Sequence, residues 1–168
     1  MATESVAGLA ALPASAAALA RAKGRAKNPF AWVFATPSDL LAWWLPSALP
    51  PGGLEPLWGR SLTLVVPGEP KRPEVAPPLC SGPLGIGLRL GVPAALLELA
   101  GGTPFLLTSA NLAGEAAPAS LDSVGPALKA AAACRLEGPP GSGEPTSVVA
   151  WTKAGPLALR GPLPEVDW

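Results

Sequence analysis

The stretch that most constrains the fold of this chain is residues 104–115, where an apolar run stops abruptly in small polar residues. Residues 105–107 are short enough for a buried strand, and two hydroxyls and an amide follow at Thr108, Ser109 and Asn111. In open α/β sheets, ligands bind just beyond the carboxyl ends of the strands. We therefore expect a strand that leads into a ligand-binding turn. The alternative is a polar turn that is closed by its own hydrogen bonds and holds no ligand.

Short strand and helix patterns alternate along the rest of the chain. Strands are predicted at residues 30–35, 61–66, 84–90, 105–107, 135–137, 146–151 and 156–160. Helices are predicted at residues 16–23 and 93–100, from Pro37 onward, and at residues 121–133 with an interruption at Gly125-Pro126. Ser15 and Thr36 are the expected N-caps of the first two helices in the chain. This alternation predicts one α/β domain over residues 1–168, and the two terminal strands form a hairpin, so the sheet is expected to be mixed.

Composition excludes several classes of chemistry. Twelve basic and twelve acidic residues cancel, and the chain contains no histidine, which rules out Ser-His-Asp and Cys-His catalysis and removes the commonest metal ligand. Cys80 and Cys134 have no partners at metal-ligand spacing, so free thiols in a reducing cytoplasm are expected, with a disulfide as the minor alternative. Residues 6–20 are apolar, but Glu4 stands where a signal peptide has basic residues, and no run is long enough to span a bilayer. We therefore expect a cytoplasmic protein without a membrane partner.

Two sets of basic residues invite a functional interpretation. Arg21, Lys23, Arg25 and Lys27 place four positive charges in seven residues, which is either a solvated helix end or an anion-binding loop. Arg89 interrupts a segment in which glycine alternates with apolar residues, and glycines inside a strand indicate close approach of a ligand or another backbone. The alternative for Arg89 is a salt bridge on an edge strand.

Taken together and in order, these segments resemble the threonylcarbamoyl-adenylate synthase family, the YrdC-like proteins, over nearly the whole chain. Thr108-Ser-Ala-Asn111 with Gly114 matches the family signature most closely. The other similar segments are Ala2–Leu9, Lys23-Gly-Arg25 with Asn28-Pro29, Ser61–Val65, Gly87–Leu90, Pro145–Val149 and Leu159–Gly161.

The resemblance implies a nucleotidyltransferase that converts L-threonine, bicarbonate and ATP into threonylcarbamoyl-AMP and pyrophosphate, for threonylcarbamoyladenosine formation on tRNA. It implies that Mg²⁺ is held through the phosphates rather than by a protein metal site. Catalysis would come from positioning of the substrates and no separate catalytic residue is identified. The implied nucleotide-binding residues are Arg25, Asn28, Ser109, Asn111 and Arg160. The implied threonine-binding residues are Ser5, Arg89 and Thr146, with Lys23 and Lys27 in the basic loop.

The chain also departs from the family pattern. The opening motif starts at Met1, so we expect either that the start is misassigned or that the sheet lacks the helix and strand that usually come first in the family, and Ala7 stands in place of a tyrosine. Val33 or Phe34 occupies the region of a substrate-contacting histidine, and Gly85 replaces a hydroxyl. These changes suggest an eroded threonine pocket and keep a second hypothesis open, a divergent paralogue that binds nucleotide, tRNA or double-stranded RNA without catalysis. Both hypotheses expect a concave basic cleft at the strand tips, where separated arginines meet Ser109; neither predicts the oligomeric state.

Overall fold

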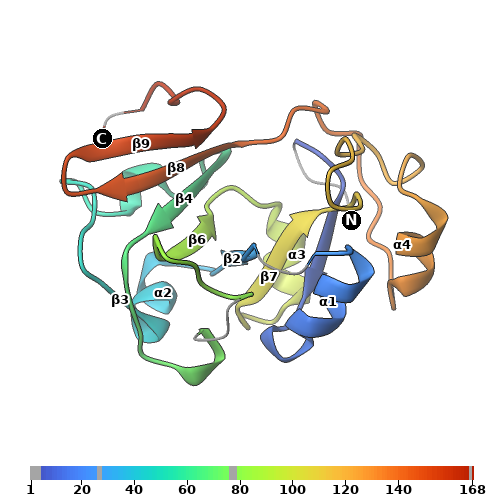
Figure 1. Cartoon of the computed structure of the whole chain (residues 1–168), viewed down its shortest axis with the longest axis horizontal. Helices are drawn as coiled ribbons and strands as arrows, with labels where there is room; N and C mark the ends of the chain where they lie inside the picture. Colours follow the sequence, from blue (N-terminus) through green and yellow to red (C-terminus); the bar gives the residue numbers. More distant parts are fainter. Residues whose placement is uncertain (1–4, 26–27, 76–78, 167) are drawn as a thin grey trace.

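The computed structural model describes residues 5–25, 28–75, 79–166 and 168 of the chain. Within them, a seven-stranded mixed sheet has the strand order β1-β7-β2-β6-β4-β8-β9 (Figure 1). Its strands are β1 (Gly8–Ala11), β2 (Ala31–Val33), β4 (Leu62–Val66), β6 (Ile86–Arg89), β7 (Phe105–Ser109), β8 (Ser147–Thr152) and β9 (Gly155–Arg160). A small second sheet pairs β3 (Trp44–Pro46) with β5 (Gly68–Pro70).

The helices are short and connect the strands. They are α1 (Ala16–Ala22), α2 (Pro37–Trp43), α3 (Ala94–Leu99) and α4 (Pro126–Ala131), with single 3₁₀ turns at Pro13–Ser15, Glu55–Leu57 and Pro73–Val75. None of the described helices is both long enough and apolar enough to cross a membrane.

The pairing directions confirm the mixed sheet. β2 runs parallel to β6 and β4 runs parallel to β8, whereas the remaining neighbours are antiparallel. β8 and β9 form the predicted terminal hairpin. β6 lies inside the sheet between β2 and β4, so the alternative of an edge-strand role for Arg89 is wrong.

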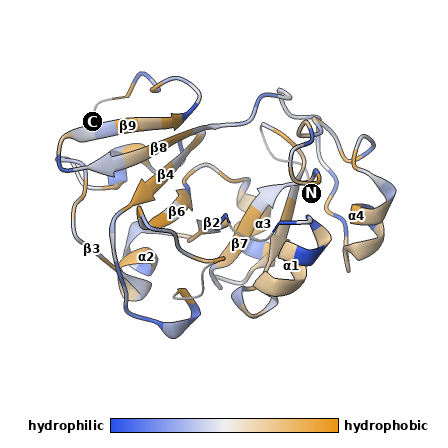
Figure 2. Cartoon of the chain, viewed as in Figure 1, coloured by the Kyte–Doolittle hydropathy of each residue, from blue (hydrophilic) through white to orange (hydrophobic). Residues whose placement is uncertain are grey.

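The alternation along β4 explains why the two faces of the sheet differ. Leu62, Leu64 and Val66 are buried in the main core, and Thr63 and Val65 between them face the other side. Each fully buried aliphatic side chain contributes about 1.5–3 kcal/mol, so this pattern fixes which face is the core. Figure 2 shows the central strands coloured mainly as hydrophobic.

Helices cover the core face and leave part of the other face open. Leu19 of α1 and Leu40 of α2 join the main core beside Trp32. Leu96 of α3 packs in a separate cluster with Val33, Phe105 and Leu107, residues that alternate along their strands with those of the main core. α3 therefore covers one part of the opposite face, and the rest of that face is available for a cleft.

Two helix N-caps were predicted, and one is confirmed. The amide of Asp39 donates to Thr36 Oγ1 (3.1 Å) while the amide of Thr36 donates to Asp39 Oδ2 (3.0 Å), which completes a capping box. Ser15 stands at the N-cap of α1, but its side chain makes no capping hydrogen bond. The reason is that Ser15 is also the last residue of the 3₁₀ turn Pro13–Ser15, so α1 continues a turn and does not begin from an extended residue.

Other predicted elements change in extent or are wrong. Residues 8–11 form a full strand, β1, and residues 135–137 form no strand in the described structure. The helix predicted from residue 121 begins only at Pro126, where proline fits the first turn because its missing N–H is not needed there. Both cysteines are free thiols, Cys80 buried and Cys134 exposed.

Candidate functional site

A cleft of about 820 Å³ opens over the uncovered face of the sheet. Its floor consists of the residues that alternate with the core residues, among them Ala31, Thr63, Gly87, Arg89 and Val148. The cleft therefore lies across the strands, which corrects the prediction that it would lie at their tips. Only the turn after β7 is placed as predicted. The physical reason is that this sheet leaves one face partly uncovered by helices.

The predicted site residues converge on this cleft. A smaller pocket of about 420 Å³ shares several of its residues and extends it toward Lys23. The predicted residues that line the main cleft are Ser5, Arg25, Asn28, Arg89, Ser109, Asn111, Thr146 and Arg160. Lys27 lies outside the described residues. Arg21 is exposed on α1 and lines neither cavity, so it does not join the basic loop at the site.

Side chains from distant segments meet at one end of the cleft. The guanidinium of Arg25 lies over the ring of Phe30, 5.4 Å from its centroid, and burial together with the nearby Arg160 lowers the Arg25 pKa. Arg160 donates from Nη2 to the carbonyl of Thr146 (2.9 Å). Two guanidinium groups that repel each other across one cavity are well placed to hold a multiply charged anion.

Lys23 adds a third cation at this end. The residue is only 3% exposed, and burial and then the charge of Arg25 lower its pKa to about 8, partly offset by Glu115. Its ammonium donates to the carbonyl of Ser109 and to Asn111 Oδ1 (3.3 Å). Lys23 is therefore both part of the cavity wall and bound to the loop that follows β7.

That loop is closed by its own hydrogen bonds. Asn111 Oδ1 accepts from the hydroxyl of Ser109, and Asn111 Nδ2 donates to the carbonyls of Leu112 (3.0 Å) and Glu115 (2.6 Å). Gly114 takes a positive φ of 90° within the turn, where a side chain would be strained. The loop therefore has the internal bonds of the second interpretation and also lines the cleft, and ligand binding by this loop stays a prediction.

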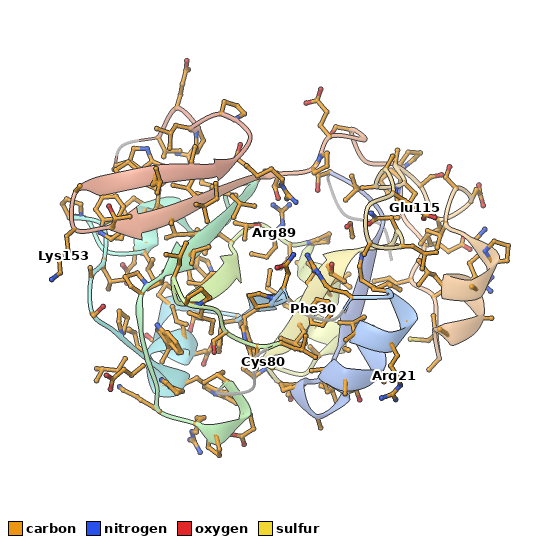
Figure 3. The ribbon with its side chains drawn as sticks, in the orientation of Figure 1. Arg21, Phe30, Cys80, Arg89, Glu115 and Lys153 are labelled. Atoms are coloured by element: carbon orange, nitrogen blue, oxygen red, sulfur yellow. The ribbon has the colours of Figure 1, made fainter. Side chains whose placement is uncertain are left out.

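Arg89 projects from the floor of the cleft. It is 6% exposed and donates from Nη2 to Ser61 Oγ (3.5 Å). The hydroxyl of Thr63 on β4 lies 3.4 Å from the hydroxyl of Thr146, the residue before β8. Figure 3 shows Arg89 near the middle of the molecule, with Glu115 on the side of β1 and β7.

Ser5 is held at the cleft by the glycine-rich loop that precedes β8. Its carbonyl accepts from the amide of Gly143 (2.7 Å) and from the hydroxyl of Ser142 (3.5 Å). Ser5 itself is buried. The first described residues of the chain are thereby tied to a segment more than a hundred residues away, so the cleft wall depends on both.

Sequence reasoning missed some lining residues. Thr63 sits within an apolar strand, and its hydroxyl was the available signal, because a polar residue at an alternate strand position faces away from the core. Glu115 lines the cleft as well, and its Oε2 accepts from the amide of Leu112 (3.1 Å). It is the one carboxylate among the described lining residues.

Most departures from the family pattern lie away from the cleft. Ala7 is fully buried against Ala110 and Val124, while Val33 and Phe34 belong to apolar clusters, and none of the three lines the cavity. These three side chains therefore belong to the cores and not to the cleft wall, and the suggestion of an eroded threonine pocket stays a prediction.

Gly85 is the departure that does line the cleft. Its φ is +117°, and a Cβ there would lie 2.0 Å from the carbonyl oxygen of Val66. A hydroxyl-bearing residue does not fit this backbone.

Among the described residues, no group of three or more His, Cys, Asp or Glu side chains could hold a metal ion. Glu115 is the carboxylate available in the cleft, and it is already bonded to the amide of Leu112. The donor set therefore suits a cation that arrives with its own anionic ligands better than one held by the protein alone.

Comparisons with known proteins agree with this architecture. A family model for the Sua5, YciO and YrdC proteins, described as "Telomere recombination", matches residues 1–161. A search of curated proteins found no match. Among solved structures, a double variant of *P. abyssi* Sua5 is 26% identical with a TM-score of 0.81, covering 98% of this chain and 52% of that one.

Two further structures place the fold. *P. abyssi* Sua5 complexed with L-threonine is 27% identical with a TM-score of 0.78, covering 95% of this chain and 48% of that one. *E. coli* YciO is 19% identical with a TM-score of 0.67, covering 94% of this chain and 79% of that one, and this likeness concerns the fold alone. The chain thus spans about half the length of the Sua5 chain it matches.

Proposed function

This chain belongs to the Sua5, YciO and YrdC family, and from that membership we propose that it acts as a threonylcarbamoyl-AMP synthase in tRNA modification. The reaction joins L-threonine, bicarbonate and ATP into threonylcarbamoyl-AMP and releases pyrophosphate. The observation that carries the proposal is that the nucleotide-binding and threonine-binding residues implied by the sequence, from several separate segments, line a single cleft.

The end of the cleft with Lys23, Arg25 and Arg160 is the proposed site of the triphosphate. Each charge-assisted hydrogen bond to a phosphate oxygen contributes about 1.5–3 kcal/mol. Anion binding there also relieves the repulsion that lowers the pKa of Arg25. Asn28 and Ser109 complete this wall, and Asn28, like Arg160, is exposed to solvent.

The floor around Arg89 is the proposed site of threonine and its carbamate. An arginine binds a carboxylate through two parallel hydrogen bonds, which a lysine cannot do. Ser5 and Thr146 line the same cleft and offer small polar groups to the substrate. The P. abyssi Sua5 structure complexed with L-threonine supports threonine as a ligand of this fold.

In the proposed reaction, the threonine amine combines with bicarbonate to form a carbamate and water. A carbamate oxygen then attacks the α-phosphorus, the bond to the bridging oxygen breaks, and pyrophosphate leaves with the electron pair. The chain's residues hold the two substrates in line and place fixed positive charge where negative charge develops. Mg²⁺, held by the phosphates of ATP, would supply further charge neutralisation.

The test is pyrophosphate release measured with ATP, L-threonine and bicarbonate together and with each omitted in turn. The proposal expects release only with all three, and no release with the full set would overturn it. The alternative paralogue is recognised in the same experiment by ATP or RNA binding without turnover, with RNA affinity falling steeply as salt rises.

A further inference from the structure

The loop after β7 contains a side chain whose hydrogen-bonding capacity is completely used inside the protein. We propose that Asn111 is a positioning residue, which fixes the turn from Ser109 to Glu115 and the direction of the Lys23 ammonium without itself contacting the bound nucleotide. The inference rests on the proposed function only in taking the ligand to be ATP.

The hydrogen bonds of Asn111 account for its whole amide. A carboxamide has two acceptor sites on oxygen and two donor hydrogens on nitrogen. Oδ1 accepts from Ser109 and Lys23, and Nδ2 donates to the carbonyls of Leu112 and Glu115. The opposite orientation would set the NH₂ group against an ammonium and the oxygen against two carbonyls, so these partners fix the assignment.

This network also decides which donors face a ligand. The single hydroxyl hydrogen of Ser109 is donated to Asn111, which leaves the Ser109 oxygen as an acceptor. Phosphate oxygens accept hydrogen bonds, so the charged donors available to a polyphosphate are Arg25, Arg160 and the third hydrogen of Lys23, beside the uncharged carboxamide of Asn28. Asn111 therefore influences binding through the groups it orients.

The backbone of Lys23 closes the same clamp from the other side. The amide of Ala113 donates to the carbonyl of Lys23 (3.0 Å), at the end of α1. Within the turn, the amide of Glu115 donates to the carbonyl of Leu112 (3.2 Å). The loop is thus joined to α1 by both the backbone and the side chain of one residue, and Asn111 links these contacts.

Asn28 provides a matched control. It is the other carboxamide that lines both cavities, it is exposed, and its side chain makes no hydrogen bond within the described part of the chain. Asn28→Ala and Asn111→Ala therefore remove the same group from the same cleft. Only Asn111→Ala removes internal partners.

The first measurement is backbone hydrogen exchange of the ligand-free proteins. We expect the amides of Leu112, Ala113 and Glu115 to exchange at least about tenfold faster in Asn111→Ala, because their loop loses its internal bonds. Exchange in β4 should not change, and Asn28→Ala should match the unmodified chain throughout. Unchanged exchange of the loop amides in Asn111→Ala would overturn the inference, whether or not the protein binds ATP.

The second measurement is ATP affinity by calorimetry, including Asn111→Asp. This variant keeps the acceptor for Lys23 and puts a negative charge behind the ammonium, where Arg25 and Glu115 are the other charged neighbours. We expect it to bind ATP about as well as Asn111→Ala at pH 7.5 and to keep its affinity to a higher pH than the unmodified chain.

Affinity more than tenfold below that of Asn111→Ala would mean that residue 111 faces the phosphates and would overturn the positioning role. Failure of every form, including the unmodified chain, to bind ATP would instead count against the proposed function, and the exchange measurement would still decide the inference.

Discussion

At the scale of single residues, burial of charge is the feature from which most of the site's behaviour follows. Lys23 and Arg89 are almost completely buried, yet both line cavities. Their charges are therefore shielded from bulk water but remain accessible to a ligand in the cavity. Such groups interact with an anion more strongly than exposed ones do, because less solvent screens the interaction. Their substitution should therefore affect stability and binding in ways that can be separated.

Lys23 should make stability depend on pH in a defined direction. Its folded pKa of about 8 lies below the ordinary 10.5, so between these values the unfolded chain binds more protons than the folded one. The cost of burying the charge is fully present below pH 8 and is relieved as the pH rises to 10.5. Compared with Lys23→Met, the unmodified chain should gain on the order of 1–2 kcal/mol of unfolding free energy over this range.

Denaturant unfolding of both proteins at several pH values measures this difference. The comparison cancels the contribution of Cys80, whose thiol pKa is raised by burial and which is present in both chains. A difference that does not change with pH would show that the Lys23 ammonium is as well solvated in the folded chain as in the unfolded one.

Arg25 should contribute directly to nucleotide affinity. Arg25→Ala is expected to weaken ATP binding by about 1.5–3 kcal/mol, the contribution of a hydrogen bond to a charged group. Arg21→Ala is the matched control, because Arg21 is exposed on α1 and lines neither cavity. Calorimetry that finds the two variants alike would remove Arg25 from the binding site.

Arg89 should distinguish the two substrates. Arg89→Lys keeps the charge and loses the paired geometry, so it is expected to raise the KM for threonine by about tenfold or more while leaving the KM for ATP nearly unchanged. Steady-state kinetics with each substrate varied in turn provides the measurement. Equal increases for both substrates would instead indicate that Arg89 supports the structure of the floor.

At the scale of elements, the close approach of the residue before β6, Gly85, to the end of β4 should leave no room for a side chain at residue 85. Gly85→Ala is expected to lose more than about 2 kcal/mol of stability, because its Cβ would meet the Val66 carbonyl at 2.0 Å and its φ is +117°. Gly87→Ala is the control, since its Cβ would have ordinary contacts of 3.9 and 4.0 Å. Thermal unfolding compares them, and similar losses would mean that the turn relaxes easily.

The elements also show which structural information is local in the sequence. β4 was predicted well because aliphatic and β-branched residues fill all five of its positions. Residues 135–137 have the composition of a strand but gain no partner, and β1 becomes a strand only because β7 pairs with it along four residues. Whether such a segment becomes a strand depends on pairing with a segment far away in the sequence, and the local residue pattern does not predict that pairing.

The same distinction applies to the site. The residues that line the cleft could be predicted from the order of the motifs, because each motif carries its own polar or charged side chain. The cleft's position over the sheet face could not, because it depends on which face α1, α2 and α3 leave uncovered. Nor could the internal bonding of Asn111, since its partner Lys23 is 88 residues away.

At the scale of the whole molecule, the cleft is lined by segments from both edges of the sheet. Arg25 and Ser109 come from the side of α1 and β7, whereas Thr146 and Arg160 come from the β8–β9 hairpin at the other edge of the sheet. A ligand that touches both sides adds a connection that the empty protein lacks. Ligand binding should consequently stabilise the complete fold rather than one loop.

This connection predicts a thermal shift that requires both sides of the cleft. At about one hundred times its Kd, a ligand adds about 2.7 kcal/mol of stability, which for a domain of this size raises Tm by about 5–10 °C. ATP with Mg²⁺ should produce that shift in the unmodified chain. Arg160→Ala should lose most of it at the same ATP concentration while changing the Tm of the empty protein little, because Arg160 is exposed and makes one hydrogen bond, to the Thr146 carbonyl. Scanning calorimetry with and without ATP measures both effects, and an equal shift in the two proteins would show that the nucleotide contacts only the α1 and β7 side of the cleft.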